Sequence, residues 1–292
     1  MAERSVALVT PSYGPDLERC RVLCDSVDER VGGFAHHYLL VADEDEPLFR
    51  SFAGTHRSVV RESDILPERF LVVPTPGGRR AWLSSFAWPL RGWHVQQLRR
   101  MALARHVDAD ALLYCDSDMA FVRPFDVGSL WRGDDLRLYR NSNGIHEQLS
   151  APGGGHEHME WTRHAHRLLG LETPRFPAHD YINNLVSWRR VDVLAMLDRI
   201  ETVTAKPWMR AVAAQRQYSE CQIYGVWAEQ VAGGQGFWID ETRLCRTFWD
   251  GDGMDAAALE RFRDGMADEQ VAVGIQSFTG TDPALVREVL RL

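Results

Sequence analysis

The chain has 292 residues, of which 45% are hydrophobic and 25% are charged, and its formal net charge is −8. This composition is ordinary for a globular protein and excludes a disordered, collagen-like or disulfide-stapled chain. The negative charge argues against a dedicated nucleic-acid binder, because such proteins usually carry positive charge that displaces counterions from phosphates. The five cysteines contain no CxxC pair, and no apolar run is long enough for a membrane span or a secretory leader, so we expect a cytoplasmic protein.

The first part of the chain alternates strand-like and helix-like segments. Apolar runs predict strands over 6–10, 38–41, 59–60, 70–73 and 111–115, and a Pro/Gly-rich stretch over 74–80 predicts a loop. Apolar residues spaced by three and four predict a helix over 17–31, with Asp16 as its N-cap, and a second helix is expected over 94–106. A buried strand, a helix and another buried strand are typical of the start of a doubly wound α/β sheet.

The second part of the chain is less regular. Strands are predicted over 136–139, 181–188 and 271–275, and helices over 193–200 and 283–292. A glycine-rich loop over 150–155 leads into a histidine-rich helix. Because the chain has no internal repeat and no long polar linker, we predict one α/β domain over 1–292, in which a nucleotide-type half over about 1–125 precedes a more elaborate half over about 126–292.

Two carboxylates follow the most apolar predicted strand. Asp116 and Asp118 flank Ser117 directly after the run 111–115, which places them at the carboxyl edge of a sheet, where open α/β sheets bind ligands. Two hard oxygen ligands suit Mg²⁺ or Mn²⁺, and a metal held in this way neutralises a diphosphate leaving group. The alternative is that these residues only start a loop or cap a helix.

The loop after the first predicted strand is a second candidate site. Ser12 and backbone amides of this loop suit a ribose or a phosphate, and Tyr13 suits stacking on a base. Neither GxGxxG nor GxxxxGK[ST] is present, which disfavours a dinucleotide-binding or a P-loop protein. The alternative is an ordinary turn between a strand and a helix.

Several stretches together resemble a known class of proteins. The quoted stretches are Val-Thr-Pro-Ser-Tyr (9–13), Tyr-Leu-Leu-Val-Ala-Asp (38–43), Gly-Trp-His-Val-Gln-Gln-Leu (92–98), Cys-Asp-Ser-Asp (115–118), Asp-Tyr-Ile-Asn-Asn-Leu-Val-Ser-Trp-Arg-Arg (180–190), Ser-Glu-Cys-Gln-Ile-Tyr-Gly (219–225) and Ile-Gln-Ser-Phe-Thr-Gly (275–280). Over nearly the whole chain they resemble nucleotide-sugar glycosyltransferases of the GT-A fold. They are most similar to a bacterial group known mainly as a domain of unknown function.

This resemblance implies a single GT-A-like domain with a Rossmann-like, mostly parallel central sheet and helices on both faces. It also implies transfer of a sugar from a nucleoside diphosphate sugar to an acceptor hydroxyl or other nucleophile, with Mn²⁺ or Mg²⁺ as cofactor. The donor would bind the first half and a small-molecule or glycan acceptor the second. By carry-over, the residues that contact the donor are Thr10, Pro11, Ser12, Tyr13, Asp43, Gln96, Gln97, Arg100, Asp116 and Ser117. The implied metal ligands are Asp116, Asp118 and Gln276, although related retaining enzymes carry a histidine where Gln276 and Ser277 stand.

Two further carboxylates are candidates for catalysis on the acceptor side. The resemblance places Asp180 and Glu220 over the donor, where either could act as the base or orient a substrate. Asp180 could equally be a turn carboxylate, and Glu220 could be a favourable charge at a helix start capped by Ser219. Retention or inversion of the anomeric configuration stays open, as do the base, sugar and acceptor.

The remaining motifs leave alternatives open. The histidines between His156 and His166 lack the spacing of a zinc site, and with the glycines at 153–155 they favour a lid. A strand followed by DxD also occurs in phosphatases of the haloacid dehalogenase type, and a sugar-nucleotide-forming nucleotidyltransferase shares the logic of the sheet. A non-catalytic binding protein is the third alternative.

Overall fold

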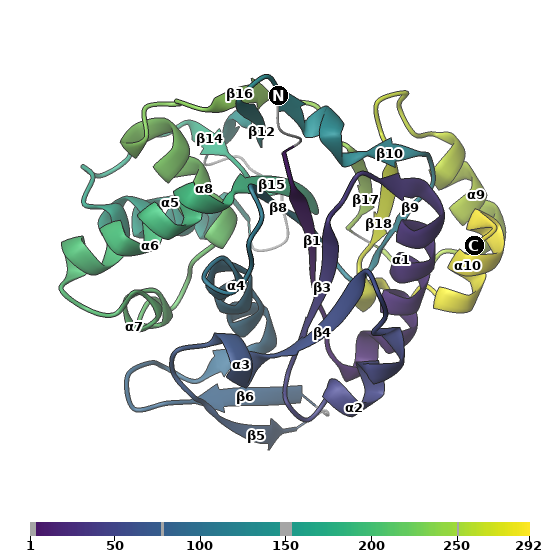
Figure 1. Ribbon diagram of the computed structural model, residues 1–292, viewed down its shortest axis with the longest axis horizontal. Helices are drawn as coiled ribbons and strands as arrows, with labels where there is room; N and C mark the ends of the chain where they lie inside the picture. The colour runs from purple at the N-terminus through teal and green to yellow at the C-terminus, as the bar shows by residue number, and fades with distance from the viewer. Residues whose placement is uncertain (1–3, 77–78, 147–153, 250) are drawn as a thin grey trace.

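The computed structural model describes residues 4–76, 79–146, 154–249 and 251–292 (Figure 1). Its centre is a five-stranded sheet with the strand order β15-β8-β1-β3-β4. These strands are β1 (Val6–Pro11), β3 (His36–Val41), β4 (Arg57–Arg61), β8 (Ala111–Cys115) and β15 (Leu185–Arg189). The four strands from β8 to β4 are parallel, and only β15 is antiparallel to its neighbour. The predicted α/β class with a mostly parallel central sheet is confirmed.

Both faces of this sheet are covered, which explains why its strands read as continuous apolar runs. Successive side chains point to opposite faces, so that Val9 packs in one core with Leu98 of α4 (Gly92–Leu103). On the other face, Leu8 packs with Leu23 of α1 (Leu17–Arg30). The predicted helices on both faces are therefore present.

The helices of the second half continue the two layers. Figure 1 shows α4 to α8 on one side of the sheet, and α1, α9 and α10 on the other. The core on the α4 side joins Leu98 to Trp208 and Ile223, so residues of both predicted halves share it. These helices are α5 (Gly154–Leu169), α6 (Arg190–Thr204), α7 (Trp208–Ala213), α8 (Glu220–Val226), α9 (Ala256–Asp264) and α10 (Pro283–Leu290).

In the described part of the chain, five smaller sheets surround the central one. The first two have the strand orders β5-β6-β7 and β11-β12-β16 and consist of β5 (Leu71–Thr75), β6 (Arg79–Leu83), β7 (Leu90–Arg91), β11 (Trp131–Arg132), β12 (Asp135–Tyr139) and β16 (Phe237–Asp240). The other three have the strand orders β17-β18-β9, β10-β2 and β13-β14. They consist of β17 (Cys245–Phe248), β18 (Ala272–Ile275), β9 (Met119–Phe121), β10 (Phe125–Asp126), β2 (Val31–Gly32), β13 (Asn141–Ile145) and β14 (Ala178–Asp180). The predicted strands over 70–73, 136–139 and 271–275 thus exist, but outside the central sheet.

Two predicted segments differ from the structure. Residues 74–75 and 79–80 of the predicted loop over 74–80 instead belong to the antiparallel strands β5 and β6, in which Pro74 pairs with Arg80, and residues 77–78 lie outside the described residues. Proline is tolerated there since β5 is an edge strand, where a missing N–H breaks no ladder. The predicted strand over 181–188 begins only at Leu185. The Asp180 carboxylate accepts a hydrogen bond from the Ile182 backbone N–H (3.0 Å), which is turn chemistry and delays the strand.

The remaining elements are short. They are the helices α2 (Glu46–Phe49) and α3 (Glu62–Ile65), and helical turns of three to five residues over 14–16, 50–52, 127–130, 227–231 and 277–279. The predicted histidine-rich helix is α5, whereas residues 150–153 of the predicted glycine-rich loop lie outside the described residues. None of the helices in the described part of the chain is long and apolar enough to cross a membrane.

Candidate active site

The two sequence motifs meet at one edge of the central sheet. Strands β1 and β8 are parallel, with Val9 opposite Tyr114, so the segments that follow them leave the sheet side by side. In the turn after β1, Asp16 lies near the DxD motif, since its negative charge contributes to the raised pKa of Asp118. The structure therefore joins the loop after β1 to the DxD motif at the edge where α/β sheets bind ligands.

The carboxylate of Asp116 is held by two partners. Its Oδ1 accepts a hydrogen bond from the Arg100 guanidinium of α4, and its Oδ2 accepts one from Nδ2 of Asn184 (3.0 Å). The Asn184 amide is itself fixed, because its Oδ1 accepts from Oγ1 of Thr247 (2.9 Å). Asp116 is only partly buried, so these contacts orient a carboxylate that solvent or a ligand still reaches.

The Arg100 side chain that binds Asp116 also forms a buried ion pair with Glu220. The Arg100 Nη1 donates to Oε1 of Glu220 at 2.7 Å, and the backbone N–H of Glu220 donates to Oε1 of Gln97 at 2.9 Å. Burial by itself lowers the pKa of Arg100, but Asp116 and Glu220 outweigh this effect and raise it. Burial raises the pKa of Glu220, and Arg100 opposes that shift. One guanidinium thus pairs with two carboxylates from distant parts of the chain.

Asp118 has an unsatisfied oxygen. Its Oδ2 accepts a hydrogen bond from the Ser277 backbone N–H at 3.0 Å, but its Oδ1 is buried and has no hydrogen-bond partner among the described residues. Burial raises the pKa of Asp118 to about 7, and the negative charges of Asp116 and Asp16 contribute to the shift. Burial of a carboxylate oxygen without a hydrogen-bond partner disfavours the ionised form.

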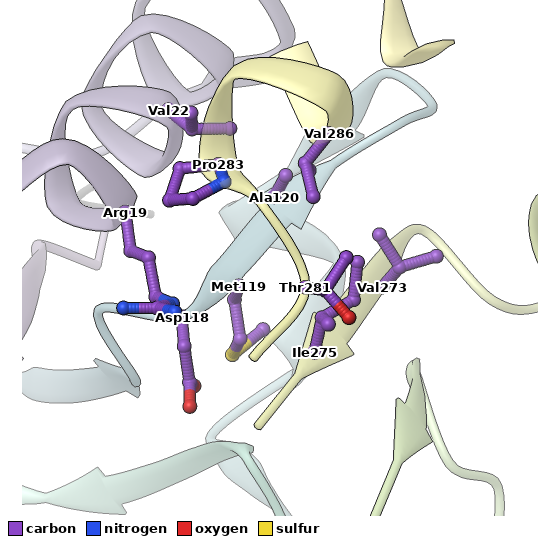
Figure 2. A pocket seen from close by; sticks show the side chains of 10 residues that line it. All are labelled: Arg19, Val22, Asp118, Met119, Ala120, Val273, Ile275, Thr281, Pro283 and Val286. Atoms are coloured by element: carbon purple, nitrogen blue, oxygen red, sulfur yellow. The ribbon is translucent and has the colours of Figure 1, made fainter. Parts of the chain in front are cut away.

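A small pocket adjoins Asp118. It holds about 20 Å³, room for one water-sized particle, and Figure 2 shows Arg19 and Asp118 next to each other at one end of it. The Arg19 guanidinium also donates to Asp16 (3.1 Å) and to the Ser277 carbonyl (3.3 Å). The rest of the lining is mainly apolar.

The residues at this edge fit a hard divalent cation. No group of three or more His, Cys, Asp and Glu side chains that could hold a metal occurs among the described residues, so carboxylates alone do not complete such a site. The unpartnered Oδ1 of Asp118 is nevertheless a ligand atom of the kind that Mg²⁺ and Mn²⁺ take. Gln276 directly precedes Ser277, whose N–H binds Asp118. Its role as a further ligand stays a prediction.

The predicted nucleoside-binding residues differ in accessibility. Thr10 is buried and its Oγ1 is hydrogen-bonded to Nε2 of His37 at 2.9 Å, so its hydroxyl is already engaged. Pro11 ends β1, and the backbone N–H of Ser12 donates to the Leu40 carbonyl (2.9 Å). Tyr13 lies at the surface with 45% of its area exposed. Of this loop, Tyr13 therefore offers the most surface to a ligand.

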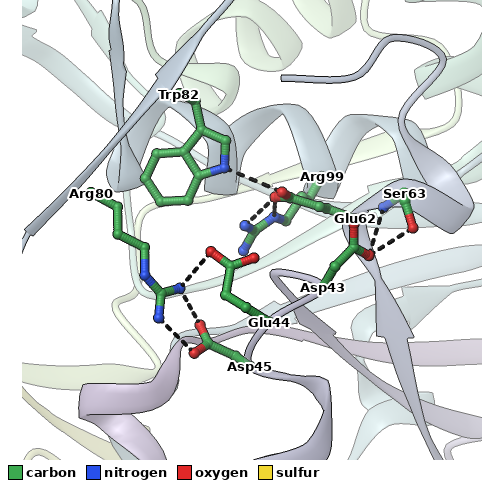
Figure 3. A network of polar contacts seen from close by, with 8 residues as sticks. All are labelled: Asp43, Glu44, Asp45, Glu62, Ser63, Arg80, Trp82 and Arg99. Atoms are coloured by element: carbon green, nitrogen blue, oxygen red, sulfur yellow. Dashed lines mark hydrogen bonds and ion pairs between the residues drawn. The ribbon is translucent and has the colours of Figure 1, made fainter. Parts of the chain in front are cut away.

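Asp43 stands at the end of β3, at the same edge of the sheet (Figure 3). Its Oδ1 accepts a hydrogen bond from the Ser63 hydroxyl at 2.6 Å, and the side chain is exposed. The neighbouring carboxylates are structural: Asp45 is bound at 2.8 Å by both terminal nitrogens of Arg80, and Glu62 accepts from Arg99 and Trp82. The contact of Asp43 with a base stays a prediction, as does that of the half-buried Gln96 with the sugar or phosphates of the donor.

The two predicted catalytic carboxylates lie on different elements. Glu220 is buried against Arg100, which suits a residue that positions Asp116. Asp180 ends β14, and its Oδ2 lies 3.6 Å from Nδ1 of His158. The side-chain amide of Gln222 donates to the His179 carbonyl at 3.0 Å and so connects α8, which begins at Glu220, with β14, which ends at Asp180. Their catalytic roles stay predictions.

The histidines of α5 have separate partners. The His164 ring is hydrogen-bonded to the Gln217 carbonyl, and Nδ1 of His166 to the Glu172 carbonyl at 2.7 Å. His158 instead packs against Trp161. Within the described part of the chain these rings form no metal-binding group.

Sequence reasoning did not select Asn184 or Thr247. Asn184 belongs to the quoted stretch 180–190, but strand direction decides its place. Because β15 is antiparallel to β8, with Leu185 opposite Cys115, the residue before β15 reaches the carboxyl edge of β8. The signal that the sequence offered for Asn184 was the pair Asn183 and Asn184 directly before a buried strand.

We expect Asn184→Ala to weaken Mn²⁺ binding by about 10- to 100-fold, because partners that orient a metal-binding carboxylate typically have effects of this size. The lost hydrogen bonds to Asp116 and Thr247 should also lower the free energy of unfolding by about 1–3 kcal/mol. Titration calorimetry with Mn²⁺ and urea denaturation measure the two effects. Asn141→Ala, at the start of β13, is the control, and equal Mn²⁺ affinity in both variants would contradict the role of Asn184.

Comparisons with known proteins complete the description. No curated protein matches the chain. Similar solved structures are an active-site mutant of LgtC (13% identity, TM-score 0.46, covering 92% of this chain and 86% of that one) and the galactosyltransferase LgtC with donor and acceptor sugar analogues (14%, 0.46, 98% and 95%). A third is mouse xyloside xylosyltransferase 1 in its apo form (8%, 0.48, 94% and 99%). A family model matches residues 5–291, and the chain therefore belongs to DUF6492, a family of unknown function.

Proposed function

We propose that this protein is a metal-dependent glycosyltransferase that moves a sugar from a nucleoside diphosphate sugar to an acceptor hydroxyl or other nucleophile. The observation that carries the proposal is the buried, unpartnered Oδ1 of Asp118 beside Asp116 at the carboxyl edge of β8. A cation there would satisfy the Asp118 carboxylate and would supply positive charge for the diphosphate of a donor.

The proposed roles of the site residues are metal binding, orientation of Asp116 and nucleoside binding. Asp116 and Asp118, with Gln276, would hold Mn²⁺ or Mg²⁺, which when bound neutralises the charge that develops on the leaving diphosphate. Arg100 and Asn184 hold Asp116 in one orientation. Tyr13 and Ser12 accept the nucleoside beside the DxD motif, since β1 and β8 are neighbours. Preorganisation of this kind lowers the cost of binding the donor.

The contacts of Asp116 favour transfer over the phosphatase alternative. A phosphatase of the haloacid dehalogenase type uses a carboxylate of its DxD motif as the nucleophile. Here both oxygens of Asp116 accept hydrogen bonds, one of them from a guanidinium, and such pairing makes the oxygens less nucleophilic. The arrangement suits a fixed ligand for ribose or metal better.

A thermal-unfolding screen tests the proposal. The full chain is melted with UDP, GDP or dTDP, each with and without Mn²⁺. We expect at least one nucleoside diphosphate to raise the melting temperature only when Mn²⁺ is present, because a ligand that binds the folded state alone stabilises it, by about 2.7 kcal/mol at one hundred times its Kd. EDTA should reverse the shift.

Each other outcome has a defined meaning. No shift with any of the three nucleotides and Mn²⁺ would overturn the proposal. Release of pyrophosphate from a nucleoside triphosphate and a sugar phosphate would indicate a nucleotidyltransferase, and hydrolysis of a chromogenic phosphate ester would indicate a phosphatase. Donor sugars that correspond to the stabilising nucleotide then identify the sugar.

A further inference from the structure

Trp93 of α4 and Trp161 of α5 form an aromatic cluster. The helix α4 also carries Gln97 and Arg100 of the candidate site. Trp93 stands in the first turn of α4, and Gln97 and Arg100 follow it four and seven residues later on the same helix face. Gln97 binds the Glu220 backbone and Arg100 binds Asp116. The helix face that is buried at the DxD motif therefore comes to the surface at Trp93, where 43% of the residue is exposed.

The indole of Trp93 is held by neighbouring rings. It packs on Trp161 of α5, with ring centroids 5.4 Å apart, and on His94 at 5.1 Å. Trp161 is only 8% exposed and its Nε1 donates to Oε1 of Gln217 at 3.2 Å. Trp161 is thus a fixed support, and Trp93 presents its remaining area to solvent without the freedom of an isolated side chain.

Polar groups border this aromatic surface. His158 packs on Trp161 with ring centroids 4.5 Å apart, and its Nδ1 lies 3.6 Å from Oδ2 of Asp180. That distance is too long for a hydrogen bond, and Nδ1 has no partner among the described residues. Asp180, whose Oδ1 accepts from Ile182, is held at the end of β14. An aromatic surface with few fixed polar groups is the usual composition of a small-molecule site.

We propose that Trp93, with Trp161, His158 and Asp180, forms the acceptor subsite, and that the acceptor is a pyranoside. This inference rests on the proposed function. A pyranose has an apolar face of C–H bonds and a rim of hydroxyls. The exposed indole suits the first, because it is a large apolar surface with little conformational freedom to lose. The Asp180 carboxylate, which only accepts hydrogen bonds, suits the hydroxyls of the rim.

Saturation-transfer NMR on the full chain tests the inference without a donor. The probes are the methyl pyranosides of galactose, glucose and mannose, each in both anomeric forms. We expect at least one of them to receive saturation at the protons of its apolar face. Trp93→Ala should weaken that binding by about tenfold or more, because it removes the aromatic surface on which the apolar face of the pyranoside packs. Asp180→Asn should weaken it while the saturated protons stay the same.

Trp88→Ala is the matched control. Trp88 is also an exposed tryptophan, at 57%, but the Arg216 guanidinium already covers its ring at 4.2 Å. This variant should bind the pyranoside like the wild type. Binding unchanged in Trp93→Ala, or no saturation of any methyl pyranoside, would overturn the subsite.

The melting shift with a nucleoside diphosphate and Mn²⁺, recorded on the same samples, separates this inference from the proposed function. A shift without pyranoside binding removes the subsite and leaves the transferase. Pyranoside binding that depends on Trp93, without any nucleotide shift, supports the sugar site and removes the transferase. Trp93 is exposed whereas Asp180 is buried at the end of β14, so equal melting temperatures without ligand are required to verify that both variants fold.

Discussion

The Asp118→Asn variant is expected to lose metal-dependent nucleotide binding and to reduce transfer by about two to three orders of magnitude, the usual effect of removing one preorganised electrostatic group. The same variant should be at least as stable as the wild type at pH 8. Burial, Asp116 and Asp16 raise the pKa of Asp118 to about 7, so its ionised form is unfavourable in the folded metal-free protein. A neutral amide of the same shape removes this penalty and still accepts from the Ser277 N–H.

The sign of the stability change follows from linkage. A carboxyl whose pKa is higher in the folded than in the unfolded state binds its proton more tightly when folded, so ionisation at higher pH costs stability. Urea denaturation at pH 8 without metal measures the change, and thermal shifts with Mn²⁺ and nucleotide measure the loss of binding. Asp108→Asn, an exposed position before β8, should leave both quantities unchanged. Mn²⁺-dependent binding that survives in Asp118→Asn would refute the ligand role.

The Arg100→Met variant is expected to lower the free energy of unfolding by about 3–5 kcal/mol, the cost of breaking a buried ion pair by removing one partner. Methionine replaces the aliphatic part of the side chain but leaves Glu220 buried and unpaired and Asp116 without its cation. Donor binding should fall as well, because Asp116 keeps only the hydrogen bond from Asn184.

A second substitution tests whether charge is the cause. Glu220→Gln in the Arg100→Met background removes the uncompensated charge, so the double variant should be more stable than the sum of the two single effects predicts. Arg105→Met is the control, since this exposed arginine lies 3.5 Å or more from its acidic partners and should matter by less than about 1 kcal/mol. Additive effects in the double variant would show that the pair is not coupled.

Local patterns predicted the elements that hold the first half of the site. The apolar runs before Thr10 and Asp116 became neighbouring parallel strands, and the helix over 94–106 was placed to within a few residues. These predictions succeed because strands buried on both faces must be continuously apolar, and because such sheets bind ligands at one edge. Single-domain organisation and the individual site residues stay predictions.

The prediction was poorer where turn chemistry or pairing partners decide the outcome. The stretch 74–80 contains prolines and glycines that favour a loop, yet both of its ends belong to paired antiparallel strands. The stretch 181–188 is apolar enough for a strand, yet side-chain hydrogen bonds to the backbone at Ile182 and Asn184 hold its first part in a turn.

The sequence by itself determined that a buried strand leads into Asp116 and Asp118, and that a loop follows the first strand, because both depend on short-range patterns. Only the tertiary structure decided what holds these carboxylates. Arg100 and Glu220 are 120 residues apart, and Asn184 reaches Asp116 across 68 residues only because β15 runs antiparallel to β8. Ion pairs and strand direction depend on how distant segments pack, and no local pattern in the sequence records that packing.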